Sequence, residues 1–107
     1  MLTIGTPGGS RIISALAQII INVIDFDMSM DAAIEAPRIH AYDGTLHIEG
    51  RIPVETIAAL EKLGHKTKVH ADFDNYFGGA QGILIDQNNG DLIGGADSRR
   101  DGVAAGY

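Results

Sequence analysis

The sequence has 107 residues, of which 45% are hydrophobic and 21% are charged, which is enough apolar material for one folded domain. With 14 acidic and 8 basic residues its formal net charge is −6, which repels phosphate backbones and argues against a nucleic-acid partner. The chain has no cysteine, which excludes disulfides and cysteine-based zinc sites. It shows no apolar run long enough to cross a membrane and no signal-peptide pattern at residues 1–3, so its location stays undetermined.

The N-terminal part predicts a tight turn followed by a long helix. Residues 5–10 read GTPGGS, and Ser10 is of the residue type that caps helix N-termini. From Arg11 to Asp25, polar residues recur every three or four positions and form one narrow stripe on an otherwise apolar helix. A helix with so wide an apolar surface needs cover on several sides, which indicates that further protein packs against it.

A second, shorter helix and a hairpin are predicted next. The helix spans roughly residues 29–35 and ends before Pro37, because a residue that precedes proline avoids the helical region. Residues 39–42 and 45–48 then alternate in polarity around Asp43-Gly44, a dipeptide typical of two-residue hairpin turns.

The next elements are a third helix and an edge strand. Pro53, at the first helical position, and Gly64 bracket the helix predicted at residues 54–63. Residues 66–71 are polar and rich in lysine, as edge strands often are, and residues 72–79 form a loop.

The last part predicts a second hairpin and a charged tail. Residues 81–86 and 92–96 are strands joined through Asn89-Gly90, and the apolar run 83–85 indicates a strand that is buried on both faces. The charged residues after this hairpin, from Asp97 onward, are interpreted as a solvated ion-pair loop in which Asp97 makes a structural hydrogen bond. The whole pattern is mixed α/β (α+β), and residues 1–107 form a single unit.

The turn before the first helix is the strongest candidate for chemistry. Gly8 and Gly9 leave backbone N–H groups bare near the positive end of a helix, as an anion or a developing oxyanion requires. The alternative is an ordinary tight turn with a cap, which the residue types alone favour. No lysine follows the glycines, so the segment is not a P-loop.

Two histidines form a second candidate. If Asp43-Gly44 is a two-residue turn, His40 and His47 lie opposite each other. There they could titrate together, or they could bind a metal with Glu49 or a partner group as the third ligand. The alternative is a pair of solvent-facing strand histidines. The motif has no third ligand of its own, so we predict neither a metal nor an organic cofactor.

Other candidates are weaker. Residues 86–91 resemble a calcium loop, but the glycine comes one place early and no glutamate stands at the twelfth position, so a hairpin turn is the better interpretation. The serines have no motif context and cysteine is absent, so no nucleophile with a base is visible.

Three motifs resemble one known family, the γ-glutamyltranspeptidases. Residues 5–13, GTPGGSRII, closely resemble its G-S-P-G-G-S-R-I-I segment, and residues 35–40, EAPRIH, resemble its A-P-R-x-H stretch. Residues 94–102, GGADSRRDG, followed by AGY at 105–107, resemble its closing G-A-S-D-P-R-x-D-G…G-Y. The resemblance covers essentially the whole chain in the same order, which makes it far more specific than any one motif.

The resemblance implies an N-terminal-nucleophile hydrolase, an αββα sandwich made from a precursor that cleaves itself into two subunits. In this family the new N-terminal threonine of the small subunit attacks a γ-glutamyl amide, such as that of glutathione. Water or an amine then resolves the acyl-enzyme, without metal or cofactor. The Pro-Gly-Gly-Ser turn supplies the oxyanion hole, which carries over to the backbone N–H groups of Gly8 and Gly9.

By this resemblance the chain is the C-terminal segment of the small subunit. The family's threonine nucleophile, paired serines and substrate-binding acidic residue lie upstream, and its carboxylate-binding arginine lies in the large subunit. We therefore expect no turnover by this chain alone, partners in the rest of the small subunit and the large subunit, a γ-glutamyl peptide substrate, and self-association of the isolated chain. Thr6 in place of Ser and Ser98 in place of Pro affect nothing catalytic.

Two alternatives stay open. The chain could be a stand-alone interaction or anion-binding module derived from this fold, which would bind a ligand without another half. Within the enzyme interpretation, related proteins also hydrolyse poly-γ-glutamate or act on β-lactam side chains. The family is often periplasmic, secreted or membrane-anchored, and the sequence does not choose between these locations.

Overall fold

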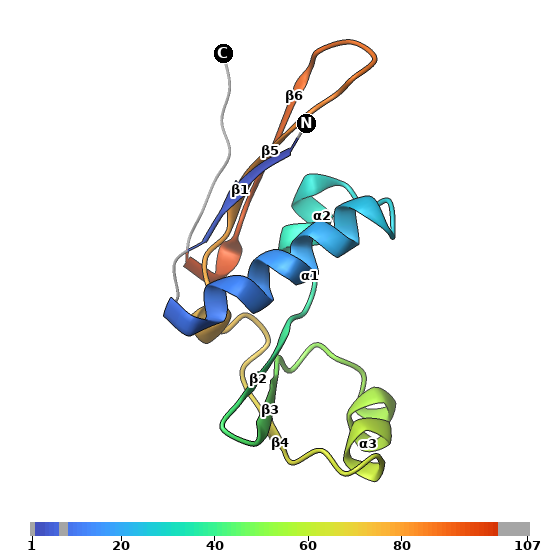
Figure 1. The fold of residues 1–107 in the computed structure, drawn as a ribbon, viewed down its shortest axis with the longest axis vertical. Coiled ribbons are helices and arrows are strands. Elements are labelled where there is room, and N and C mark those ends of the chain that lie inside the picture. Colours follow the sequence, from blue (N-terminus) through green and yellow to red (C-terminus); the bar gives the residue numbers. More distant parts are fainter. Residues whose placement is uncertain (1, 7–8, 101–107) are drawn as a thin grey trace.

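Two small sheets and three helices make up the computed structural model, which describes residues 2–6 and 9–100 (Figure 1). The first sheet has the order β1-β5-β6 and the second has the order β2-β3-β4. The strands are β1 (Leu2–Gly5), β2 (Ile39–Tyr42), β3 (Thr45–Ile48), β4 (Thr67–Val69), β5 (Gln81–Ile85) and β6 (Leu92–Ala96). The helices are α1 (Ile12–Ile24), α2 (Met30–Glu35) and α3 (Val54–Lys62), with 3₁₀ turns η1 (Gly9–Arg11), η2 (Asn75–Phe77) and η3 (Ser98–Arg100).

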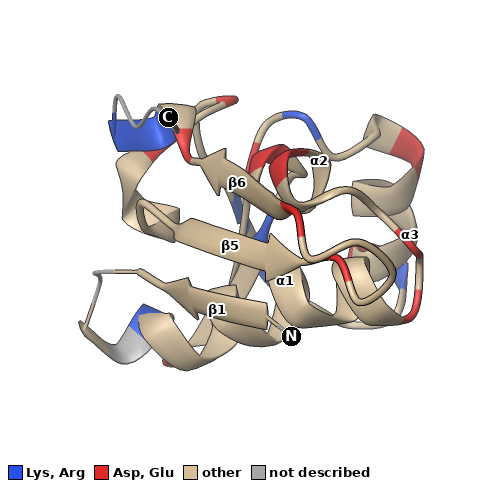
Figure 2. Ribbon diagram, turned by 90° about the horizontal axis from the view of Figure 1, so that it is seen from above, with Lys and Arg blue, Asp and Glu red and all other residues tan. Residues whose placement is uncertain are grey.

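Helices α1 and α2 cover one side of the first sheet, as Figure 2 shows from above. All pairs in this sheet are antiparallel. Its core consists of a few fully buried side chains: Ile19, Met30, Ala33, Ile34 and Ala80. The packing is close because the sheet presents glycines to α2: a Cβ on Gly95 would lie 2.9 Å from Cγ of Met30 and 3.0 Å from the backbone N of Asp31. These glycines therefore admit a helix that a side chain would push away.

The second sheet lies at the other end of the molecule together with α3 (Figure 1). Strands β2 and β3 form the predicted hairpin, with Asp43 and Gly44 at φ values of 50° and 76°, as a type I′ turn requires. Strand β4 pairs with β3 in parallel and forms an edge, shorter than the sequence predicted. None of the α3 side chains is buried.

Helix α1 turns its polar stripe toward the protein and much of its apolar surface outward. Gln18 donates from Nε2 to the carbonyl of Ile39 at 2.7 Å and accepts from the Ile39 N–H at 2.9 Å, so its amide acts as a short partner strand for β2. Ser14 donates to the same carbonyl at 3.1 Å. Meanwhile Ile13 is 81% exposed and Ile24 is 67% exposed. Much of the apolar surface of α1, against which the sequence predicted that further protein packs, is thus exposed in this chain.

Several local predictions are corrected. Helix α1 begins one residue later than expected, after the 3₁₀ turn η1, and Arg11 rather than Ser10 occupies its N-cap position. Pro53 is the N-cap of α3 and not its first helical residue. Strand β5 is not buried on both faces, because Ile83 on the outer face of the sheet is 45% exposed. None of the helices within residues 2–6 and 9–100 is long and apolar enough to span a membrane.

Candidate active-site segment

The turn between β1 and α1 is held at its edges. Gly9 opens η1 with a φ of +60°, and a Cβ added to it would meet nothing within 4 Å, so backbone conformation rather than space selects glycine there. Before the turn, the Thr6 hydroxyl accepts a 3.0 Å hydrogen bond from the backbone N–H of Gly79. Gly8, the other predicted oxyanion donor, lies outside the described residues.

An open cleft of about 380 Å³ adjoins this turn. It is lined by the end of β1, the start of β5 and η3, through residues Gly5, Thr6, Gly79, Gln81 and Arg100. The Arg100 guanidinium donates to the carbonyl of Asn75 at 3.0 Å and covers Gly79, where a Cβ would lie 2.6 Å from its Cδ. The cleft therefore has a cation, Arg100, among its lining residues.

The two predicted histidines do face each other. His40 and His47 are register partners in the β2–β3 hairpin, but the polar contact of His47 is with His70, at 2.8 Å between Nδ1 and Nε2. His70 in turn contacts Asp74 at 3.3 Å. No sequence pattern pointed to His70, which is close only because β4 pairs with β3. No group of three or more side chains suited to a metal occurs within the described residues.

Burial is the main cause that lowers the pKa of both His40 and His47. Desolvation, together with the charge of Arg11, lowers the pKa of His40, whose two ring nitrogens are buried and have no hydrogen-bond partner in the part of the chain that the structure describes. Desolvation followed by the charges of His70 and Lys68 lowers the pKa of His47. The pKa of Asp74 is lowered mainly by the hydrogen bond it accepts from the backbone of Tyr76.

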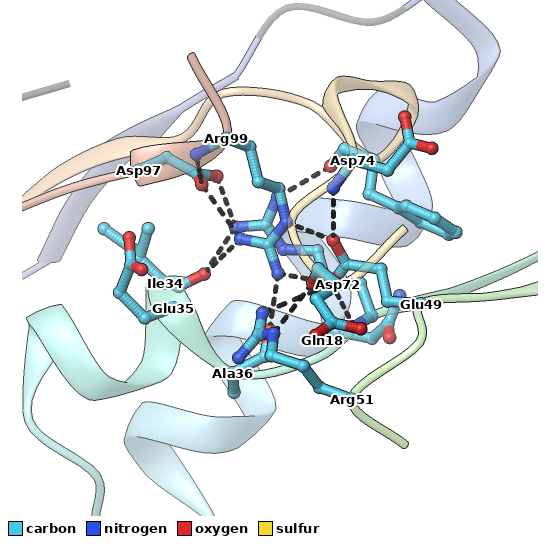
Figure 3. A network of polar contacts seen from close by, with 12 residues as sticks. Gln18, Ile34, Glu35, Ala36, Glu49, Arg51, Asp72, Asp74, Asp97 and Arg99 are labelled. Carbon is cyan, nitrogen blue, oxygen red and sulfur yellow. Dashed lines mark hydrogen bonds and ion pairs between the residues drawn. The ribbon is translucent and has the colours of Figure 1, made fainter. Parts of the chain in front are cut away.

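Two residues of the charged tail, Asp97 and Arg99, are buried, contrary to the prediction of a solvated ion-pair loop, whereas Arg100 is exposed and Asp101 lies outside the described residues. Figure 3 shows Arg99 between two carboxylates. It donates to Glu49 at 2.6 and 2.5 Å and to Asp97 at 2.9 Å, and Arg38 completes the network through a 2.9 Å ion pair with Asp97. The predicted structural hydrogen bond of Asp97 is present, because it accepts from the backbone N–H of Ala80 at 2.9 Å.

This network joins parts of the chain that are far apart in sequence. Arg99 also donates to the carbonyls of Ile34 and Ala36, and Glu49 accepts from the backbone N–H of Arg38. Burial alone raises the pKa of Asp97, but backbone hydrogen bonds and two nearby guanidinium groups lower it overall. Burial alone lowers the pKa of Arg99, whereas hydrogen bonding to Glu49 raises it above its ordinary value. Two cations and two carboxylates thus balance inside the fold.

Comparison with known proteins decides the family. The family profile described as Gamma-glutamyltranspeptidase matches residues 1–107. The glutathione hydrolase proenzyme of Bacillus subtilis (strain 168) is 38% identical over 107 residues, which are 99% of this chain and 18% of that protein. This chain belongs to the γ-glutamyltranspeptidase family.

Solved structures of γ-glutamyltranspeptidases and a related acylase confirm the fold. A mutant of Helicobacter pylori γ-glutamyltranspeptidase has a TM-score of 0.81 at 33% identity, over 92% of this chain and 54% of that one. The cephalosporin acylase from Bacillus halodurans has a TM-score of 0.91 at 34% identity, over 97% of this chain and 19% of that one. The predicted α+β segment of an N-terminal-nucleophile hydrolase is therefore correct. The chain spans about a fifth of the curated glutathione hydrolase it matches.

Proposed function

We propose that residues 1–107 act as one unit, the C-terminal segment of the small subunit of a γ-glutamyltransferase/hydrolase. In this proposal the segment stabilises the oxyanion formed when a γ-glutamyl amide, such as that of glutathione, is attacked by a threonine outside this chain. Gly8 and Gly9 present their backbone N–H groups to the oxyanion, and the rest of the segment holds them in place. The chain alone is inactive.

The observation that carries this proposal is the left-handed Gly9 at the start of η1, the 3₁₀ turn that leads into α1, in the motif matched by the family profile. A positive φ breaks the regular path of the chain there, and the helix dipole adds partial positive charge near the first N–H groups. Donors of this kind are preorganised, so they stabilise developing negative charge without reorganising. The exposed apolar surface of α1 supports a partner, because we propose that the rest of the small subunit and the large subunit cover it.

A chimera tests the proposal. This chain replaces the matching residues of the Bacillus subtilis glutathione hydrolase proenzyme, and release of a γ-glutamyl anilide is measured. The wild-type chimera is expected to turn over and the isolated chain is not. Gly8→Pro removes one N–H donor and is expected to raise the barrier by about 2.7–4 kcal/mol, or roughly 10²–10³-fold in kcat.

A second glycine provides the matched control. Gly90, in the β5–β6 hairpin, also has a positive φ (+76°) and also has no atom within 4 Å of an added Cβ. Gly9→Ala and Gly90→Ala therefore introduce the same backbone strain, and only Gly9→Ala is expected to lower kcat. Equal kcat values for the two variants, or a folded chimera without turnover, contradict the proposal.

The rival is a binding module without catalysis. It is favoured if the isolated chain binds a γ-glutamyl peptide or a simple carboxylate on its own, while the chimera shows no turnover. The enzyme proposal expects the reverse. The donor and acceptor preferences, including poly-γ-glutamate and β-lactam side chains, are properties of the intact protein.

A further inference from the structure

The segment 76–79 contacts the chain on both sides of the glycine turn. On one side, the N–H of Gly79 donates to the Thr6 hydroxyl at 3.0 Å. On the other side, the guanidinium carbon of Arg11 lies 4.4 Å from the centroid of the Tyr76 ring. In Figure 1 this gold segment runs beside the first turn of α1. The turn is thus bracketed by two contacts to one short stretch of chain.

Arg11 depends on the ring for its position. Its Nε is buried without a hydrogen-bond partner, and within the described residues no carboxylate forms an ion pair with it. A guanidinium in this state gains from lying over an aromatic face, and the gain is larger where water is excluded. The Tyr76 ring is therefore a contact that holds Arg11 at the start of α1, in addition to the hydrogen bond from Ser14 to Ile39.

Tyr76 is itself fixed from several sides. Its ring stacks on His47 at 4.9 Å and on His70 at 4.6 Å between centroids, and it meets the edge of Phe77 at 5.1 Å. Its backbone N–H donates to Asp74 at 2.9 Å, which caps η2. His47 and His70 are joined at 2.8 Å, so the ring cannot shift without disturbing two strands and a cap.

We propose that Tyr76, acting through Arg11, positions the Gly8–Gly9 turn for catalysis. This inference rests on the proposed oxyanion role of that turn. Neither side chain touches the reacting atoms, so both are positioning residues. Their effect follows from geometry, because a displacement of about 1 Å at a catalytic group can cost on the order of 100-fold in rate.

The kinetic test compares two changes at one position in the chimera described above. Tyr76→Leu removes the aromatic face and is expected to lower kcat by roughly 10- to 100-fold while KM stays within about twofold, because the oxyanion forms only after binding. Tyr76→Phe keeps the face and is expected to stay within about threefold of the parent. Tyr42→Leu removes an exposed tyrosine from β2 and is expected to have no effect.

Arg11→Gln is the second variant, because it leaves the aromatic stack intact while removing the cation. It is expected to reproduce the kcat loss of Tyr76→Leu. The inference is overturned if Tyr76→Leu keeps the parental kcat, or if Tyr76→Phe is as impaired as Tyr76→Leu. A loss confined to KM overturns it as well.

A measurement on the 107-residue chain separates this inference from the proposed function. The amide NMR signals of Gly8 and Gly9 are expected to move, and their hydrogen exchange to accelerate, in Tyr76→Leu but not in Tyr76→Phe. Unchanged glycine signals in Tyr76→Leu overturn the positioning role even if the parent chimera is active. An inactive parent chimera overturns the proposed function, while the glycine signals still decide whether Tyr76 positions the turn.

Discussion

Replacing Glu49 by glutamine should remove a large part of the stability of this chain. The side chains of Glu49 and Arg99 are both 0% exposed, and two hydrogen bonds of 2.6 and 2.5 Å join them. Glutamine has nearly the shape of glutamate, but it carries no negative charge, so one positive charge in the buried network loses its partner. Its NH₂ group also faces an N–H donor of Arg99. Removing one partner of a buried pair costs about 3–5 kcal/mol. A domain of this size is stable by only about 5–15 kcal/mol.

Urea unfolding followed by far-UV circular dichroism measures this change, provided that the m-values of the two proteins agree. Glu61→Gln is the matched control, because Glu61 is exposed and accepts one hydrogen bond from Thr67 at 2.7 Å. The control is expected to change the free energy of unfolding by less than about 0.5 kcal/mol. A loss below about 1 kcal/mol for Glu49→Gln, the range of exposed ion pairs, would refute the reasoning.

Three further predictions concern acid, a cap and an exposed surface. The folded pKa of His47 lies below the ordinary 6.5, so the unfolded chain binds more protons and the free energy of unfolding should fall as pH drops below about 6.5. Titration of His47→Gln should show a flatter dependence, and an equal slope would contradict this. Ser29 caps α2 by accepting from Ala32 at 3.2 Å, so Ser29→Ala should cost about 1 kcal/mol in thermal or urea unfolding, whereas Ser29→Asp should not. The isolated chain should self-associate in sedimentation, and Ile13→Glu should reduce association without loss of stability; a monomeric parent at high concentration would disprove this.

Features determined by neighbouring residues could be predicted from the sequence. Asp43-Gly44 specified the first hairpin, where both residues have a positive φ, and Gly90 supplies the positive φ in the turn of the second, because few other residues adopt this conformation without strain. The limits of α2 followed from the Ser29 cap and from Pro37. The facing positions of His40 and His47 followed from the hairpin register alone.

Features that depend on distant pairing could not be predicted in the same way. Arg99 and Glu49 are 50 positions apart, and a cluster of charges after a strand is usually solvated. His70 meets His47 only because β4 adds to the hairpin in parallel. The exposure of Ile83 depends on what covers the sheet, which the residues of the strand themselves do not specify.

The polar core and the exposed apolar surface have one cause. Helix α1 uses its polar side chains Ser14 and Gln18 to bind β2, where Gln18 completes the hydrogen bonds of Ile39. Ala15 and Ile19 are buried, but much of the apolar surface of the helix faces outward. The interior between the two sheets is then left to Arg38, Glu49, Asp97 and Arg99, which hold it through directional bonds. Such bonds fix geometry better than they add stability. The exposed apolar residues of a segment built in this way would gain stability from further protein packed against them.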